Sequence, residues 1–127
     1  MTPETRGEPT IRVTLLPRDT NAHGTIFGGV ILSYIDQAGA IAARCHSPDR
    51  VVTVALKEVV FHEPVFVGDL VSFYSEVTRV GTSSISVHVD VRAERYLQPG
   101  KHVQVTEADV IFVAVDANGR KVRAVPL

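Results

Sequence analysis

Asp36 is the residue whose type and surroundings most clearly suggest chemistry. With a rotation of about 100° per helical residue, its side chain shares a face with mostly small neighbours: Gly29, Leu32, Gly39, Ala40 and Ala43. Small side chains let another group approach a helix closely, and a mid-helix glycine such as Gly39 costs about 1 kcal/mol relative to alanine. The pattern favours a carboxylate in a confined site over the alternative, an exposed aspartate that meets water or an arginine.

Two glycines, Gly28 and Gly29, open the same predicted helix. The first backbone N–H groups of a helix have no helical acceptor and lie at the positive end of its dipole, so they can hold an anion or stabilise an oxyanion. Gly28 precedes Asp36 by about two turns, and we expect its amide and the carboxylate to lie within reach of one small reacting group. A tight entry into a crowded helix explains the glycine pair equally well.

The histidines and the cysteine form no recognisable site. No pair of histidines has metal-ligand spacing, so we predict no metal; they are His23, His46, His62, His88 and His102. His62 and Glu63 are interpreted as strand-end residues rather than an acid/base pair. Cys45 has no nucleophile signature and is expected to be a small buried hydrophobic residue.

Ser83 and Ser84 follow Gly81 at a predicted hairpin. Their hydroxyls and the amides of the turn could bind phosphate. Ordinary hairpin chemistry explains the same residues as well. Both interpretations stay open at this point.

These residues are carried by one predicted helix and about five predicted strands. Helical spacing of apolar residues predicts a helix over 26–44, after a loop of turn-forming residues at 18–24. Alternation and a high valine content predict strands at 10–16, 51–61, 67–80, 83–95 and 102–115. The order predicts an α+β fold in which one side of an antiparallel sheet wraps against the helix.

The 127-residue chain has a formal net charge of -1 and a single cysteine. One domain is expected, formed by residues 10–127 after a flexible N-terminal tail of residues 1–9. Scattered basic residues do not favour nucleic-acid binding, and no apolar run is long enough to favour a membrane span. We therefore expect a cytoplasmic protein.

Five short motifs occur along the chain: residues 17–29 (PRDTNAHGTIFGG), 33–39 (SYIDQAG), 52–54 (VTV), 61–69 (FHEPVFVGD) and 79–84 (RVGTSS). Together they resemble the hotdog-fold acyl-CoA thioesterases, most closely the YciA-like group. The resemblance implies a hotdog fold and hydrolysis of acyl-CoA to a free acid and CoA, with no separate cofactor. It also implies an active site at the interface of a homodimer, and a trimer of dimers as the larger assembly.

The resemblance implies a catalytic role for four residues. Asp36 matches the family's carboxylate, which acts as general base or as nucleophile. Asn21 matches a loop asparagine that helps to hold the water or the thioester. Gly28 and Gly29 match the helix start whose amides polarise the thioester carbonyl.

Other matches concern substrate binding. Thr53 matches a strand position near the site, and a turn that holds the pantetheine and nucleotide parts of CoA matches Gly81, Thr82, Ser83 and Ser84. Two other functions remain as alternatives: a non-catalytic acyl-CoA sensor and a hotdog-type hydratase or dehydratase. The hydratase would need a histidine near the site, for which His23 is the candidate.

Overall fold

The computed structural model describes residues 7–127. Of the predicted tail, residues 1–6 lie outside the described residues, and residues 7–9 have no regular secondary structure. In chain order the elements are β1 (Ile11–Thr14), the 3-10 helix η2 (Pro17–Asp19), α1 (Gly28–Ala43), the 3-10 helix η3 (Arg44–His46), β2 (Arg50–Phe61), β3 (Leu70–Val80), β4 (Ser84–Glu94) and β5 (His102–Val115).

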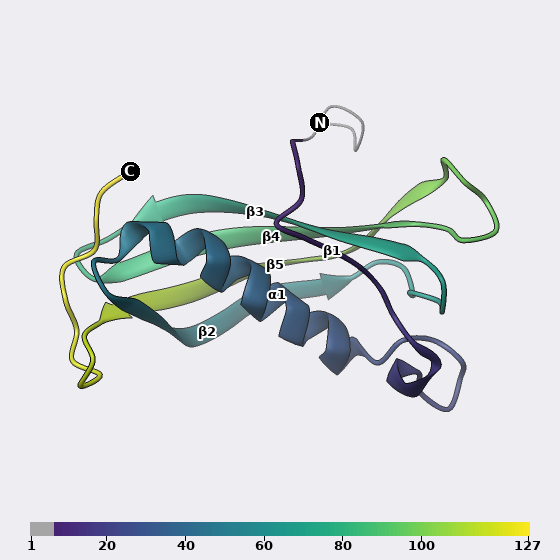
Figure 1. The fold of residues 1–127 in the computed structure, drawn as a ribbon, viewed down its shortest axis with the longest axis horizontal. Coiled ribbons are helices and arrows are strands. Elements are labelled where there is room, and N and C mark those ends of the chain that lie inside the picture. The colour runs from purple at the N-terminus through teal and green to yellow at the C-terminus, as the bar shows by residue number, and fades with distance from the viewer. Residues whose placement is uncertain (1–6) are drawn as a thin grey trace.

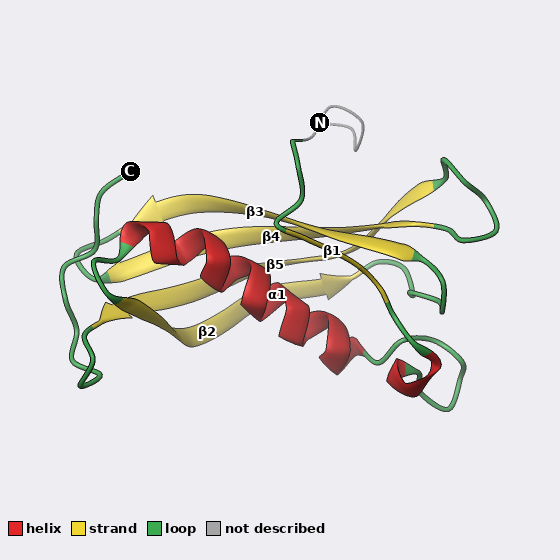
Figure 2. Ribbon diagram, in the orientation of Figure 1, coloured by secondary structure: helices red, strands yellow, loops and turns green. Residues whose placement is uncertain are grey.

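The strands form one antiparallel sheet in the order β1-β3-β4-β5-β2, and α1 lies across one face of it (Figures 1 and 2). The predicted α+β architecture is confirmed. The helix begins later than predicted because Phe27 is extended, with ψ 133°, and its amide donates to the Asp19 carbonyl. No helix among residues 7–127 combines the length and apolar content needed to cross a membrane.

The core lies between α1 and the sheet. Ile31, Ile35 and Ala38 of α1 are buried against strand residues such as Phe73 and Phe112. At Gly39 the two layers approach closely, because a Cβ atom built there would lie 3.0 Å from ring atoms of Phe112. The expected close approach at Gly39 is confirmed, and the approaching group is an aromatic ring of β5.

Candidate active site

Asp36 and Thr53 form a hydrogen-bonded pair between α1 and β2. The Thr53 hydroxyl donates to Oδ1 of Asp36 at 2.6 Å. Asp36 is half-buried, and its second oxygen, Oδ2, has no hydrogen-bond partner among residues 7–127. One oxygen is therefore oriented by the protein while the other is free to accept a proton from a bound molecule.

The phase of β2 places three side chains on the helix side of the sheet. Thr53 pairs with Phe112, which packs against α1, and Phe61 lies against the first residue of α1. Two register shifts interrupt the strand, and the first of them turns Leu56 to the helix side as well. Glu58, within the second shift, has a positive φ of 52°. On this side of β2 the polar Thr53 is therefore followed by an apolar wall, which the side chains of Leu56 and Phe61 form beside α1.

The N-terminal end of α1 presents unpaired backbone donors. No acceptor among residues 7–127 is within hydrogen-bonding distance of the amides of Gly28 and Gly29. A Cβ atom on Gly28 would lie 3.4 Å from the ring of Phe61, whereas one on Gly29 would meet open space. This end of the helix can therefore stabilise negative charge on a bound group.

Asn21 shapes the loop before α1. Its Oδ1 accepts hydrogen bonds from the amides of His23 at 2.8 Å and Thr25 at 3.2 Å, and its Nδ2 donates to the Thr25 hydroxyl at 2.9 Å. The loop is in turn joined to the segment after β2 through a bridge between Thr25 and Phe66. Among residues 7–127, Asn21 forms no hydrogen bond with Asp36 of the same chain.

Gly28 and Asp36 are too far apart in one chain to act on one small group. Because α1 is continuous from Gly28 to Ala43, the eight residues between them rise by about 12 Å. The expectation that both reach the same reacting group is therefore wrong within a single chain. A site that uses both must take them from different copies.

The turn that contains Gly81, Thr82, Ser83 and Ser84 lies at the opposite end of α1 from Gly28 (Figure 1). The final segment of the chain holds it there: the amide of Ala124 donates to the Thr82 carbonyl, and the amide of Val125 donates to the carbonyl of His46. Gly81 has little room for a side chain, since a Cβ atom would lie 2.6 Å from Oγ of Ser84. The predicted CoA turn is thus close to neither Gly28 nor Asn21 of its own chain.

Cys45 is exposed, which makes the prediction of a buried cysteine wrong. It lies in η3, where the chain leaves α1 and turns toward β2, so its position no longer follows the buried face of the helix. Among residues 7–127 no group of histidine, cysteine, aspartate and glutamate side chains could hold a metal ion.

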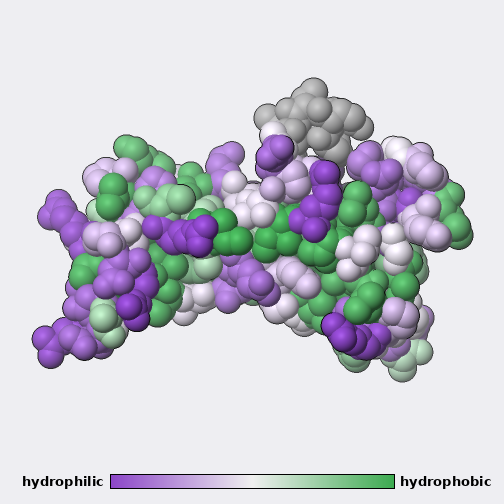
Figure 3. Space-filling model, viewed as in Figure 1, coloured by the Kyte–Doolittle hydropathy of each residue, from purple (hydrophilic) through white to green (hydrophobic). Residues whose placement is uncertain are grey.

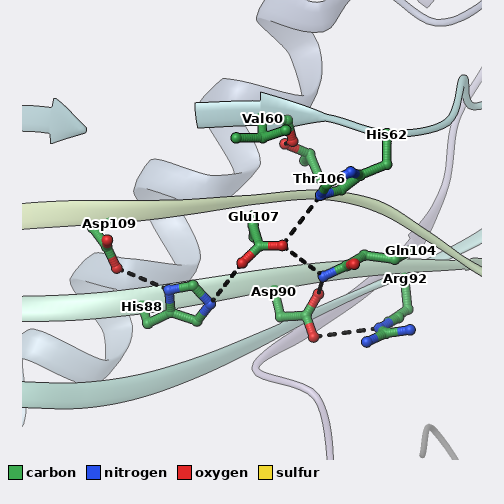
Figure 4. A network of polar contacts seen from close by, with 9 residues as sticks. All are labelled: Val60, His62, His88, Asp90, Arg92, Gln104, Thr106, Glu107 and Asp109. Atoms are coloured by element: carbon green, nitrogen blue, oxygen red, sulfur yellow. Dashed lines mark hydrogen bonds and ion pairs between the residues drawn. The ribbon is translucent and has the colours of Figure 1, made fainter. Parts of the chain in front are cut away.

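A polar network on the outer face of the sheet, away from α1, is a feature that the sequence did not predict (Figure 4). Nδ1 of His88 lies 2.8 Å from Oδ1 of Asp109, and Nε2 of His62 lies 3.1 Å from Oε2 of Glu107. Gln104 donates to both Glu107 and Asp90. The available signal was the polar half of the alternation in β4 and β5, where valines occupy the buried half.

The family model of the thioesterase superfamily matches residues 23–99. The acyl-CoA thioester hydrolase YciA of Escherichia coli K12 is 40% identical over 124 residues, which cover 96% of this chain and 93% of the relative.

The solved structures that resemble this chain are thioesterases as well. A hexameric hotdog-fold thioesterase of Campylobacter jejuni is 51% identical with a TM-score of 0.88, over 93% of this chain and 90% of the other. HI0827, a hexameric broad-specificity acyl-coenzyme A thioesterase solved with an aspartate replaced by alanine, is 42% identical with a TM-score of 0.88, over 95% and 88%.

An acyl-CoA hydrolase of Staphylococcus aureus has been solved with butyryl coenzyme A and coenzyme A; it is 33% identical with a TM-score of 0.83, over 91% of this chain and 70% of the other. Two variants of that enzyme replace an aspartate and a threonine 17 residues apart. Asp36 and Thr53 have the same separation. The chain belongs to the thioesterase superfamily, within its hotdog-fold acyl-CoA thioester hydrolases of the YciA type.

Proposed function

We propose that this protein hydrolyses acyl-CoA thioesters to a free carboxylic acid and CoA, with Asp36 as the catalytic carboxylate. The observation that carries the proposal is the Asp36–Thr53 pair, in which Oδ1 accepts a hydrogen bond from a hydroxyl and Oδ2 has no hydrogen-bond partner among residues 7–127. The paired residues lie beside the apolar wall formed by Leu56 and Phe61, which suits an acyl chain.

A thioester carbonyl is already electrophilic, so its hydrolysis needs an activated water and a stabilised oxyanion. In one route Oδ2 of Asp36 takes a proton from water while the oxygen adds to the carbonyl. In the other, the carboxylate itself adds and forms a mixed anhydride, which water then hydrolyses. In both, the carbon–sulfur bond breaks and the CoA thiolate leaves and is protonated.

The oxyanion site in this proposal is the start of α1 from a second copy. The amides of Gly28 and Gly29 have no acceptor among residues 7–127, and the length of α1 separates them from Asp36 of their own chain. Asn21, in the loop before the same helix start, would arrive with them and help to hold the water or the thioester. Each site therefore combines Asp36 and Thr53 of one subunit with Asn21, Gly28 and Gly29 of another.

The free edge of β2 supports a homodimer. β2 is an edge strand, and its exposed apolar side chains are Val52, Val54, Leu56, Val60 and Phe61. A long apolar strand edge with unpaired backbone groups is covered most simply by a second copy of the same strand. Relatives form hexamers, and we propose a trimer of dimers here. Sedimentation at micromolar concentration should give an assembly that is at least dimeric; a stable monomer would remove the shared site.

The hydratase alternative is not favoured by the side chains around Asp36. Among residues 7–127 the hydrogen-bond partner of Asp36 is the Thr53 hydroxyl rather than a histidine. His23 stays the one candidate for a hydratase, because it lies in the loop that would bring Asn21 from the second copy. We propose that the enzyme works in the cytoplasm on acyl-CoA, with CoA as product rather than as a cofactor.

The test is a panel of acyl-CoA substrates, from acetyl through long-chain to aryl, assayed by release of the CoA thiol. Turnover of at least one class by the wild-type protein, lost in Asp36→Asn, is the expected result. An Asp36→Asn variant that turns over every substrate as fast as wild type would overturn the assignment of Asp36. Binding without turnover by the wild-type protein across the panel would favour the sensor.

A further inference from the structure

A buried ion pair, formed by Asp69 and Arg95, joins two connections at the end of the molecule where α1 begins. Asp69 closes the β2–β3 connection, residues 62–69, and Arg95 opens the β4–β5 connection, residues 95–101. Figure 1 shows both connections at this end, beside the loop that precedes α1. Nη1 of Arg95 donates to Oδ2 of Asp69 at 2.6 Å. The side chains of Arg95 and Asp69 are 14% and 3% exposed, so this buried pair is less accessible to water than the ion pairs of the outer face.

The buried pair holds the turn that ends the β2–β3 connection from both sides. Oδ2 of Asp69 also accepts the amide of Phe66 at 3.0 Å, and Nη1 of Arg95 donates to the carbonyl of Pro64 at 2.8 Å. The guanidinium of Arg95 lies 4.9 Å from the centre of the Phe66 ring. From the other connection, the amide of Tyr96 donates to Oδ1 of Asp69 at 3.2 Å. Phe66 is therefore fixed through both its backbone and its ring.

The turn held by the buried pair supports the loop that contains Asn21. Phe66 forms a β-bridge with Thr25, and the amide of Ile26 donates to the carbonyl of Val65 at 2.8 Å. Thr25 bonds Asn21 twice, because its hydroxyl accepts from Nδ2 and its amide donates to Oδ1. A continuous series of contacts therefore runs from the buried pair to Asn21 and to the residues that lead into α1.

The burial of two charges at this place favours a role in geometry. Exposed apolar side chains of the same two connections, Phe66, Val67 and Leu97, lie next to the buried pair. Figure 3 shows hydrophobic residues on the surface at this end of the molecule. Apolar side chains of similar size often stabilise a protein as well as a buried ion pair does, so the pair is a poor device for stability alone. Its directed hydrogen bonds fix the position of a turn, which apolar packing does less precisely.

We infer that Asp69 and Arg95 are positioning residues for the shared site, which they serve through the Asn21 loop of their own subunit. This inference rests on the proposed function, in which Asn21 and the start of α1 enter the site of another copy. Small displacements of groups that hold a reactant cost large factors in rate. Loosening the turn should therefore lower kcat at Asp36 of the partner subunit and leave the Asp36–Thr53 pair of its own subunit unchanged.

The other explanation is that the buried pair only stabilises the fold. Removing one member leaves an unpaired buried charge, which lowers the stability of the whole subunit. Activity then falls with the fraction of protein that is folded, and both sites of a dimer are affected. A positioning role instead lowers kcat in folded protein, and only in the site that receives the altered loop.

The first measurement compares kcat and KM of Arg95→Met and Arg95→Lys with those of Arg92→Met. Arg92 is a matched control, because it is an arginine of the neighbouring strand β4 that contacts an aspartate, Asp90, at 3.3 Å on the outer face. Lysine keeps the charge of Arg95 but lacks the planar group that lies over Phe66. In protein with wild-type circular dichroism, we expect kcat for acyl-CoA to fall by about tenfold in Arg95→Met, with a smaller change in KM. The loss should be smaller in Arg95→Lys and less than about twofold in Arg92→Met.

If Arg95→Met does not fold, the double variant with Asp69→Asn takes its place, because it removes both buried charges together. The double variant should show the same loss of kcat in folded protein. A wild-type kcat in either of these variants would overturn the inference.

Subunit mixing determines which site the buried pair serves. Arg95→Met protein is unfolded and refolded with Asp36→Ala protein, and separately with Asn21→Ala protein, and thiol release from acyl-CoA is assayed. With Asp36→Ala, each hybrid dimer has one intact site and one site with both defects, so about a quarter of wild-type activity should return. With Asn21→Ala, both sites of the hybrid are defective, and activity should not exceed the mean of the separate variants.

The opposite pattern, recovery with Asn21→Ala but not with Asp36→Ala, would overturn the inference, because the buried pair would then serve Asp36 of its own subunit. Recovery in neither mixture, or a kcat loss in Arg92→Met equal to that in Arg95→Met, would leave the pair a structural role only. The proposed function fails separately, if wild type hydrolyses no acyl-CoA or if Asn21→Ala and Asp36→Ala proteins recover no activity when mixed with each other.

Discussion

The two sides of the sheet differ in how completely one chain satisfies its own polar groups. On the outer face, His88, Asp109, Glu107, Gln104 and His62 bond to one another (Figure 4). On the helix side, one Asp36 oxygen and the amides that open α1 have no hydrogen-bond partner among residues 7–127, and β2 ends the sheet with an apolar edge. The polar groups of the outer face are paired within the chain, whereas in our proposal a second copy and a substrate complete the α1–β2 side.

The contrast predicts where substitutions will reduce activity. Groups on the α1–β2 side have few partners inside the chain, so their loss should affect catalysis with little effect on folding. Groups in the outer network bond mainly to each other, so their loss should affect neither strongly.

Asp36→Asn should lower kcat by about 10²- to 10⁴-fold, because an amide can neither accept the proton of water nor attack the carbonyl as a carboxylate does. The substitution is nearly isosteric and leaves the Thr53 hydroxyl an acceptor, so circular dichroism and acyl-CoA binding should stay at wild-type values. Turnover comparable to wild type in a well-folded variant would contradict a chemical role for Asp36.

Thr53→Val should lower kcat by about tenfold, since it removes the hydroxyl that orients Asp36 while keeping the shape of the side chain. Because Thr53 is exposed on an edge strand, the free energy of unfolding should change little. Thr53→Ser restores the donor and should recover most of the lost rate. If serine were no better than valine, the 2.6 Å hydrogen bond would not be the reason for the loss.

Gly39→Ala should lower the free energy of unfolding by about 1–2 kcal/mol, as the new methyl group would meet the Phe112 ring and overcome the gain in helix propensity. Gly29→Ala in the same helix is the matched control, because its methyl group would meet open space. Denaturant unfolding of the two variants should therefore give shifts of opposite sign or, for Gly29→Ala, no shift. A stabilised Gly39→Ala protein would contradict the tight packing.

His88→Gln should have the smallest effect, with a loss of less than about 1 kcal/mol in unfolding free energy, because half-exposed ion pairs contribute little. Its kcat/KM should match that of wild type. A loss of activity as large as that of Thr53→Val would mean that the outer face takes part in the site, and the division between the two sides would fail.

The helix and the strands could be predicted because their apolar residues follow regular periods. Val87, Val89 and Val91 alternate with polar residues in β4, and the apolar residues of α1 recur at helical intervals. The close approach at Gly39 could also be predicted from a local signal, because a glycine in the middle of a helix indicates a neighbouring group that occupies the space of a side chain. These are local signals, and a single sequence carries them directly.

The arrangement of the site could not be predicted as fully. The contact between Asp36 and Thr53 depends on the register of β2 against β5, and no local sequence pattern predicts that register. The separation of Gly28 and Asp36, about 12 Å along α1, follows from the rise of a continuous helix and not from the periodicity of its residues. The prediction of a buried Cys45 was wrong because it relied on the usual burial of free cysteines, whereas η3 places this residue on the surface.

Subunit complementation tests the shared site most directly. Asn21→Ala and Asp36→Ala proteins, each nearly inactive alone, are unfolded and refolded together, and thiol release from acyl-CoA is assayed. If Asn21 of one subunit serves Asp36 of the other, each hybrid dimer has one intact site and one site with both defects. Random mixing makes half of the dimers hybrid, so about a quarter of wild-type activity should return if the sites are independent. Activity no higher than the mean of the separate variants, with subunit exchange verified by mass, would place both residues in the site of a single chain and contradict the account.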